Sequence, residues 1–246
     1  MKNVLFLFVI TIATAFAPAT PRQNMLVGAW RSQTTINGTA MTQVLLFSNG
    51  YFSSTLYHSK DGAFFQTVGG SFTVENGMLT LHYEFNSSDS TKVGTTDSGK
   101  LEIKGNVLQI KGGNGNQFKG EALDAGITTD LTGAWLMAGR KQNDQITRRD
   151  TSTPRKTMKL LSGKRFQWIA YNTETKQFMG TGGGTYTAEN GVYTENLEFF
   201  SRDNKRVGMK LEFNYEVQGN DWHHSGKSSA GEPMYEIWAK RDLENK

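Results

Sequence analysis

The chain contains an internal repeat. Residues 44–110 align with residues 158–224 without a gap, and the two segments share 22 identities in 67 pairs. Upstream, Leu26–Trp30 (LVGAW) aligns with Leu131–Trp135 (LTGAW). Each copy spans about a hundred residues, which is enough to bury a core of its own. The repeat therefore predicts two similar domains and a short linker between them, at 24–123, 131–242 and 124–130.

The first nineteen residues have the pattern of an export signal. Lys2 supplies a positive charge, and residues 4–16 are apolar and uncharged but too short to span a bilayer comfortably. Small residues follow, so we expect cleavage near Ala15 or Ala19. The mature protein is expected to be exported, periplasmic or secreted, without a stable membrane span. The alternative is an anchor that is not cleaved.

Composition narrows the classes of function. The chain has no cysteine, which excludes disulfides, thiolate metal ligands and a thiol nucleophile. The formal net charge is +4, and no long basic run indicates nucleic-acid binding. Glycine and aromatic residues are plentiful and proline is scarce, which favours strands and tight turns over disorder.

The local pattern is nearly all β. Residues 207–217 alternate apolar and polar side chains, which places the two kinds on opposite faces of one strand. Turn signals separate the strands, among them the Asn-Gly pairs at 49–50, 76–77 and 190–191. Such pairs supply the positive φ angles of short hairpins, so neighbouring strands should follow one another in up-and-down order.

The second copy contains about eight candidate strands, the usual number for a small closed barrel. They are predicted at 132–138, 156–161, 165–171, 177–187, 192–200, 206–217, 221–226 and 233–240. A β-sandwich would also alternate, but the meander order and the lack of long crossing connections favour a barrel. The fold class is therefore predicted as all-β, with two tandem up-and-down antiparallel barrels.

Two motifs carry a family resemblance. Gly28 with Trp30, and Gly133 with Trp135, match the Gly-x-Trp of the first strand of lipocalins (calycins). The run from 178 to 186, with the segments 193–195, 221–226 and 236–238, resembles the lipocalin-like domain of exported Bacteroidetes proteins of unassigned function. The resemblance implies a barrel and ligand binding, but no defined activity.

The same resemblance implies a role for the tryptophan. In lipocalins it plugs the closed end of the barrel and packs near a basic residue late in the last strand. Lys240 or Arg241 would fill that position in the second copy, and Lys119 is the candidate in the first.

The two copies differ at positions predicted to face inward. If the apolar face of 207–217 points inward, the matching positions of the strand before it are Tyr193, Glu195, Leu197 and Phe199. Their partners in the first copy are Leu79, Leu81, Tyr83 and Phe85. On the next strand, Trp222 and His224 correspond to Leu108 and Ile110. The second copy thus has a carboxylate and an imidazole where the first has aliphatic side chains.

An unpaired buried carboxylate is costly, so Glu195 should have a partner or reach water, and His224 is the candidate by strand order. An apolar wall with a polar anchor is typical of ligand sites. The predicted ligand-binding residues are Trp168, Tyr193, Glu195, Phe213, Trp222 and His224. The alternatives are a structural pair in a packed barrel, or a register that turns both side chains outward.

The first copy has its own irregularity near 93–103. Thr95, Asp97 and Gly99 occupy inward positions that the second copy fills with Met209, Leu211 and Phe213. That wall is either wet and open or broken by a bulge.

The second copy has nine extra residues between 136 and 157, in a region rich in Arg and Lys. A basic lid including Arg148 and Arg149 would attract an anionic ligand, such as a fatty acid or an acidic glycan. The alternative is a solvated loop.

Enzyme signatures are mostly absent: the chain has no Gly-x-Ser-x-Gly elbow and no His-Glu-x-x-His pair. His223 and His224 point to opposite faces of a strand, which suits a metal poorly. We therefore expect a non-enzymatic protein without cofactor or metal. It would bind a small hydrophobic or amphipathic ligand, an anionic one included, in the second barrel rather than the first. The alternative is a protein- or glycan-interaction module of the envelope. The sequence does not indicate an oligomeric state.

Overall fold

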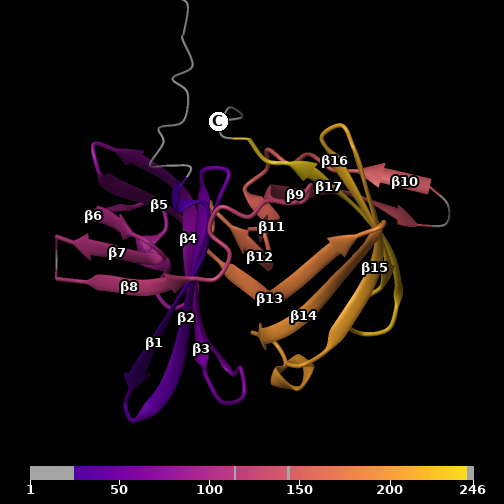
Figure 1. The fold of residues 1–246 in the computed structure, drawn as a ribbon. Helices are drawn as coiled ribbons and strands as arrows, with labels where there is room; N and C mark the ends of the chain where they lie inside the picture. The colour runs from indigo at the N-terminus through magenta and orange to yellow at the C-terminus, as the bar shows by residue number, and fades with distance from the viewer. Residues whose placement is uncertain (1–24, 114, 143–144, 243–246) are drawn as a thin grey trace, which may run out of the picture.

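The computed structural model describes residues 25–113, 115–142 and 145–242. The predicted leader lies outside the described residues. The chain forms two closed eight-stranded antiparallel barrels that lie side by side (Figure 1). The prediction of an all-β protein with two tandem up-and-down barrels is confirmed.

Barrel 1 closes by pairing its first strand with its last, through Trp30 opposite Ala122 and Arg31 opposite Glu121. Its eight strands follow chain order: β1 (Gly28–Ile36), β2 (Thr39–Ser48), β3 (Tyr51–His58), β4 (Phe64–Glu75), β5 (Met78–Asn86), β6 (Thr96–Lys104), β7 (Val107–Gly112) and β8 (Gln117–Ala122). A short 3₁₀ helix, η1 (Ser90–Lys92), precedes β6.

Barrel 2 closes by pairing β9 with β17, and β10 is a ninth strand attached beyond the closed set. Its strands are β9 (Gly133–Gln142), β10 (Gln145–Arg148), β11 (Arg155–Leu161), β12 (Arg165–Asn172), β13 (Phe178–Glu189), β14 (Val192–Phe200), β15 (Lys210–Gln218), β16 (Asp221–Lys227) and β17 (Pro233–Lys240). The 3₁₀ helix η2 (Asn204–Arg206) precedes β15.

Parts of barrel 2 differ from the sequence-based prediction, which ended the first strand at 138 whereas β9 continues to Gln142. The strand predicted at 206–217 begins at Lys210, because Asp203 caps η2 by accepting from the backbone N–H of Lys205. Strand β10, in the segment interpreted as a loop, was not predicted. The Asn-Gly turns behave as expected, and at Asn76 and Asn190 the φ angles are 50° and 51°.

Each barrel has a separate apolar core, and the tryptophan of its first strand is fully buried in it. The indole Nε1 of Trp30 donates to the carbonyl of Leu26 at 3.0 Å, and that of Trp135 donates to Leu131 at 2.8 Å. These equivalent bonds satisfy the indole N–H and hold the short entry segment against the barrel.

Outward-facing side chains of β3 and β12 are buried between the barrels. At the centre, Gln167 donates to the hydroxyls of Thr67 (3.0 Å) and Thr181 (2.9 Å), and its carbonyl oxygen accepts from Thr55 (2.9 Å). Because both ends of this buried amide have partners, its desolvation is offset by hydrogen bonds.

Two carboxylates flank this centre, each bound to a tyrosine of the other barrel. Tyr171 donates to Glu84 at 2.7 Å, and Tyr57 donates to Glu198 at 2.8 Å. Arg241 pairs with Glu84, and Arg165 pairs with Glu198. The carboxylates therefore cross-link the two barrels.

This interface bears on two expectations. Of the two basic residues expected near Trp135, Lys240 lies opposite Trp135 in the pairing of β17 with β9, whereas the Arg241 guanidinium lies between the barrels, 4.1 Å from the ring of Tyr51. Phe199 was predicted to face inward, which is wrong. A bulge opposite Gly183 and Gly184 shifts the register, so Phe199 stacks on Tyr57 of barrel 1 while Phe200 packs with the core of barrel 2.

Candidate functional site

Barrel 1 contains a cavity of about 620 Å³ that opens to solvent. Apolar side chains line most of its depth, and polar side chains cluster toward the starts of β4, β6 and β8 and the end of β7. The lining residues include Leu45, Phe47, Phe52, Leu79, Leu81, Tyr83, Ile110 and Phe118, with Gln43, Ser54, Gln66, Asp97 and Gln117 among the polar ones. Small-molecule sites in proteins have this size and mixture.

Small residues on two strands explain why barrel 1 is open. Ser54 of β3 and Gly99 of β6 line the cavity, and the repeat aligns them with Trp168 and Phe213 of barrel 2. The latter two side chains pack in the core of barrel 2. Because a short side chain leaves volume inside a barrel of fixed strand number, the space that the Trp168 ring fills in barrel 2 is open beside Ser54 in barrel 1. At Gly99 the space is partly closed by Ile110, whose Cγ2 would lie 3.0 Å from an added Cβ.

The irregular wall of the first copy is thus an open one. β6 pairs with both neighbours without a register shift, from Met78 opposite Lys100 on one side to Gly99 opposite Gly112 on the other. Asp97 and Gly99 contribute to the cavity wall, as their inward positions require.

The polar part of the cavity contains the carboxylate of Asp97, which is hydrogen-bonded to Tyr83. The hydroxyl of Tyr83 donates to Oδ2 of Asp97 at 3.0 Å, and Gln43 Nε2 donates to the hydroxyl of Ser54 at 2.9 Å. Burial and the hydrogen bond to Asp97 raise the pKa of Tyr83 well above its usual value, so the phenol keeps its proton and remains a donor.

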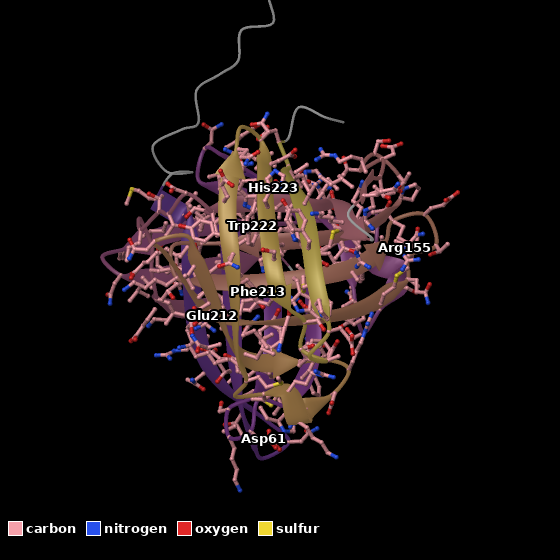
Figure 2. The ribbon with its side chains drawn as sticks, turned by 90° about the vertical axis from the view of Figure 1, so that its right-hand side faces the viewer. Asp61, Arg155, Glu212, Phe213, Trp222 and His223 are labelled. Atoms are coloured by element: carbon pink, nitrogen blue, oxygen red, sulfur yellow. The ribbon has the colours of Figure 1, made fainter. Side chains whose placement is uncertain are left out.

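In barrel 2, the structure places all six residues predicted for the ligand site in the interior. Trp222, Tyr193 and His224 are almost fully buried, as are Glu195 and Phe213, while Trp168 is half-buried. Their rings contact one another: the His224 ring centre lies 4.1 Å from that of Phe213, 5.2 Å from Trp222 and 5.6 Å from Tyr193. Figure 2 looks onto this side of barrel 2, with Phe213 and Trp222 on the neighbouring strands β15 and β16.

The partner of Glu195 is a residue that sequence reasoning missed. Lys159 Nζ lies 2.7 Å from Oε1 of Glu195, and Tyr193 donates to the same oxygen at 3.0 Å. Both members of the ion pair are about 5% exposed. The repeat contained the signal, because Lys159 aligns with the core residue Leu45 of barrel 1.

Aromatic rings surround the buried ammonium. Lys159 Nζ lies 4.9 Å from the ring centre of Trp222, 5.0 Å from Tyr193 and 5.2 Å from Trp238. Cation–π attraction and the ion pair together offset part of the desolvation cost. The interior of barrel 2 is therefore occupied by its own charged and aromatic side chains.

His224, predicted to partner Glu195, is near a different carboxylate. Its Nδ1 lies 3.7 Å from Oε2 of Glu236, and neither ring nitrogen has a hydrogen-bond partner among the described residues. Burial, with the charge of Lys159, lowers the pKa of His224 well below 6.5, so the imidazole is neutral near pH 7. Burial raises the pKa of Glu236.

The two arginines of the predicted basic lid are bound to the barrel. Arg148 makes a bidentate pair with Asp221, at 2.7 and 3.2 Å, and Arg149 Nε donates to the carbonyl of Met137 at 2.5 Å. Their hydrogen-bonding capacity is therefore partly used within the protein.

A family model described as a domain of unknown function (DUF4488) matches residues 130–246, the part of the chain that contains barrel 2. No curated protein matches the chain. In the described part of the chain, no helix is long and apolar enough to cross a membrane. The second half of the chain is thus similar to a family of uncharacterised domains.

Proposed function

We propose that this protein is a non-enzymatic carrier or receptor that binds a small amphipathic molecule in barrel 1. The observation that supports this proposal is the open cavity of about 620 Å³, with an apolar lining and a polar edge. Export, which the leader sequence predicts, is part of the proposal.

The choice of barrel 1 departs from the preference drawn from the sequence. That preference rested on Glu195 and His224. In the structure Glu195 is paired with Lys159, and aromatic rings pack around both residues. A ligand in barrel 2 would have to displace these contacts, whereas barrel 1 needs no rearrangement to admit one. Barrel 2 as a ligand site, and an envelope module without internal ligand, stay predictions of the sequence.

The test is binding of a neutral fluorescent apolar dye, 1-N-phenylnaphthylamine, to the mature chain. We expect one saturable site. Ser54→Trp should abolish it, because the new indole would fill in barrel 1 the space that Trp168 fills at the equivalent position of barrel 2. Lys119→Trp is the matched control, since Lys119 is exposed on the cavity-lining strand β8. A dye that binds wild type, S54W and K119W equally well would contradict the proposal.

Mass spectrometry of protein purified from its native host provides a second test. A small amphipathic molecule should co-purify with wild type and K119W and be lost from S54W.

A further inference from the structure

The residues that line the cavity of barrel 1 favour a ligand of one charge. This inference rests on the function proposed above. Of the described residues that line the cavity, Asp97 is the one with an ionisable charge at neutral pH. The others are apolar, hydroxyl or amide side chains and glycines. A ligand headgroup inside this cavity therefore meets a negative charge and no compensating lysine or arginine among those residues.

The Asp97 carboxylate is exposed and accepts a hydrogen bond from a neighbouring side chain of the cavity wall. Tyr83 donates to Asp97 at 3.0 Å, and the Tyr83 ring makes an edge contact with Phe52, with ring centres 6.0 Å apart. Asp97 itself lies opposite Leu81 on the neighbouring strand. Because one lone pair of the carboxylate accepts from Tyr83, the other oxygen is available to a ligand.

Aromatic side chains line the same space. Phe47, Phe52, Phe118 and Tyr83 all line the cavity. A carboxylate together with several aromatic rings is the arrangement that recognises ammonium groups, by charge attraction and by cation–π contacts. A carboxylate headgroup would be repelled by Asp97 instead.

The barrel does not need this arrangement in order to fold. The repeat aligns Asp97 with Leu211 and Tyr83 with Leu197, and both leucines pack with the core of barrel 2. The acid–phenol pair is therefore particular to barrel 1 and lies in the wall of its cavity.

We propose that barrel 1 binds cationic amphiphiles, molecules with an amine or quaternary ammonium head and an apolar body, and that Asp97 is the residue that selects the head. The apolar body packs against the phenylalanines, and the ammonium lies beside Asp97. The charge of this ligand is opposite to that of the anionic ligand that the basic segment of the second copy suggested.

Three probes with an unbranched ten-carbon chain, the carboxyl carbon of decanoate included, test the proposal: decyltrimethylammonium, decanol and decanoate, each used to displace 1-N-phenylnaphthylamine at low salt and pH 7. We expect affinity to fall in that order, with the ammonium bound about tenfold more tightly than decanoate. Asp97→Asn should weaken decyltrimethylammonium about fivefold and leave decanol unchanged.

Glu121→Gln is the matched control, because it removes the same charge from an exposed position of β8 outside the cavity lining. If D97N and E121Q give the same affinities, or if decanoate binds as tightly as decyltrimethylammonium, the selection of a cation is wrong although the cavity still binds ligands. If no probe displaces the dye, or the dye itself does not bind, the proposed function fails as well.

Discussion

The two barrels share a fold and differ in what fills them. Barrel 1 has Leu45, Leu81 and Ile110 where barrel 2 has Lys159, Glu195 and His224. At two other positions barrel 1 has the smaller residue: Ser54 and Gly99 of barrel 1 align with Trp168 and Phe213 of barrel 2. Barrel 1 is open and has leucines at the positions of the buried ion pair, whereas barrel 2 contains the Lys159–Glu195 pair and is filled. Closure of the sheet thus does not determine whether the interior is a cavity.

The largest expected effect comes from breaking the ion pair that only barrel 2 has. Lys159→Leu leaves the Glu195 carboxylate buried without a counter-charge, and we expect a loss of about 3–5 kcal/mol in the free energy of unfolding. The double variant Lys159→Leu/Glu195→Leu, which copies Leu45 and Leu81, should lose about 1 kcal/mol. Urea denaturation measures both, and a loss in the double variant as large as in Lys159→Leu would contradict the explanation, because the cost would then not come from an unpaired Glu195 carboxylate.

A swap of side-chain volume sharpens the comparison at intermediate cost. Trp168→Ser gives barrel 2 the residue that barrel 1 has at that position, and removing the half-buried indole should cost about 2–3 kcal/mol. We expect the dye 1-N-phenylnaphthylamine to gain a second site in W168S, and the double variant with S54W to bind in barrel 2 alone. Unchanged stoichiometry in W168S would mean that Trp168 does not keep barrel 2 closed.

The smallest effect concerns pH. Because the folded protein holds the pKa of His224 below 6.5, the unfolded chain takes up a proton that the folded chain does not. The stability that follows from this is fully present above pH 6.5 and is lost as the pH falls, by at most about 1.4 kcal/mol per pH unit. His224→Ile, the residue of barrel 1, should lack this loss.

Glu236 acts in the opposite direction in wild type and in H224I alike. Its raised pKa contributes stability at low pH that is lost as the pH rises above 4.5. The difference between wild type and H224I therefore isolates the histidine. Urea denaturation at pH 7.5, 6 and 5 measures it, and parallel pH profiles would contradict the assignment.

Much of this architecture could be predicted from the repeat and from alternation of side chains. Turn geometry at Asn76 and Asn190 and the inward direction of Trp222 and His224 are local consequences of residue type and of period two. They need no knowledge of the rest of the chain.

Three features depended on tertiary context. The inward parity predicted for Phe199 fails at a bulge whose position is set by close packing: a Cβ at Gly184 would lie 2.0 Å from the carbonyl oxygen of Asn196. Lys159 aligned with a leucine, but pairing it with Glu195 required strands β11 and β14 to face each other across a closed barrel. The cavity of barrel 1 is a sum of small volumes, such as those at Ser54 and Gly99, that no single residue indicates.

The two tyrosine–glutamate contacts between the barrels have a consequence for how the sequence of each barrel can vary. Tyr57 to Glu198 and Tyr171 to Glu84 are the same contact made twice, each residue exchanged for its counterpart 114 positions away. This is the self-complementary pattern of a two-fold dimer, here within one chain. Covalent linkage makes the pairing independent of protein concentration, and it frees each half to vary alone. The carboxylate at position 97 is therefore present once in the pair of barrels, whereas a dimer of identical subunits would contain it twice.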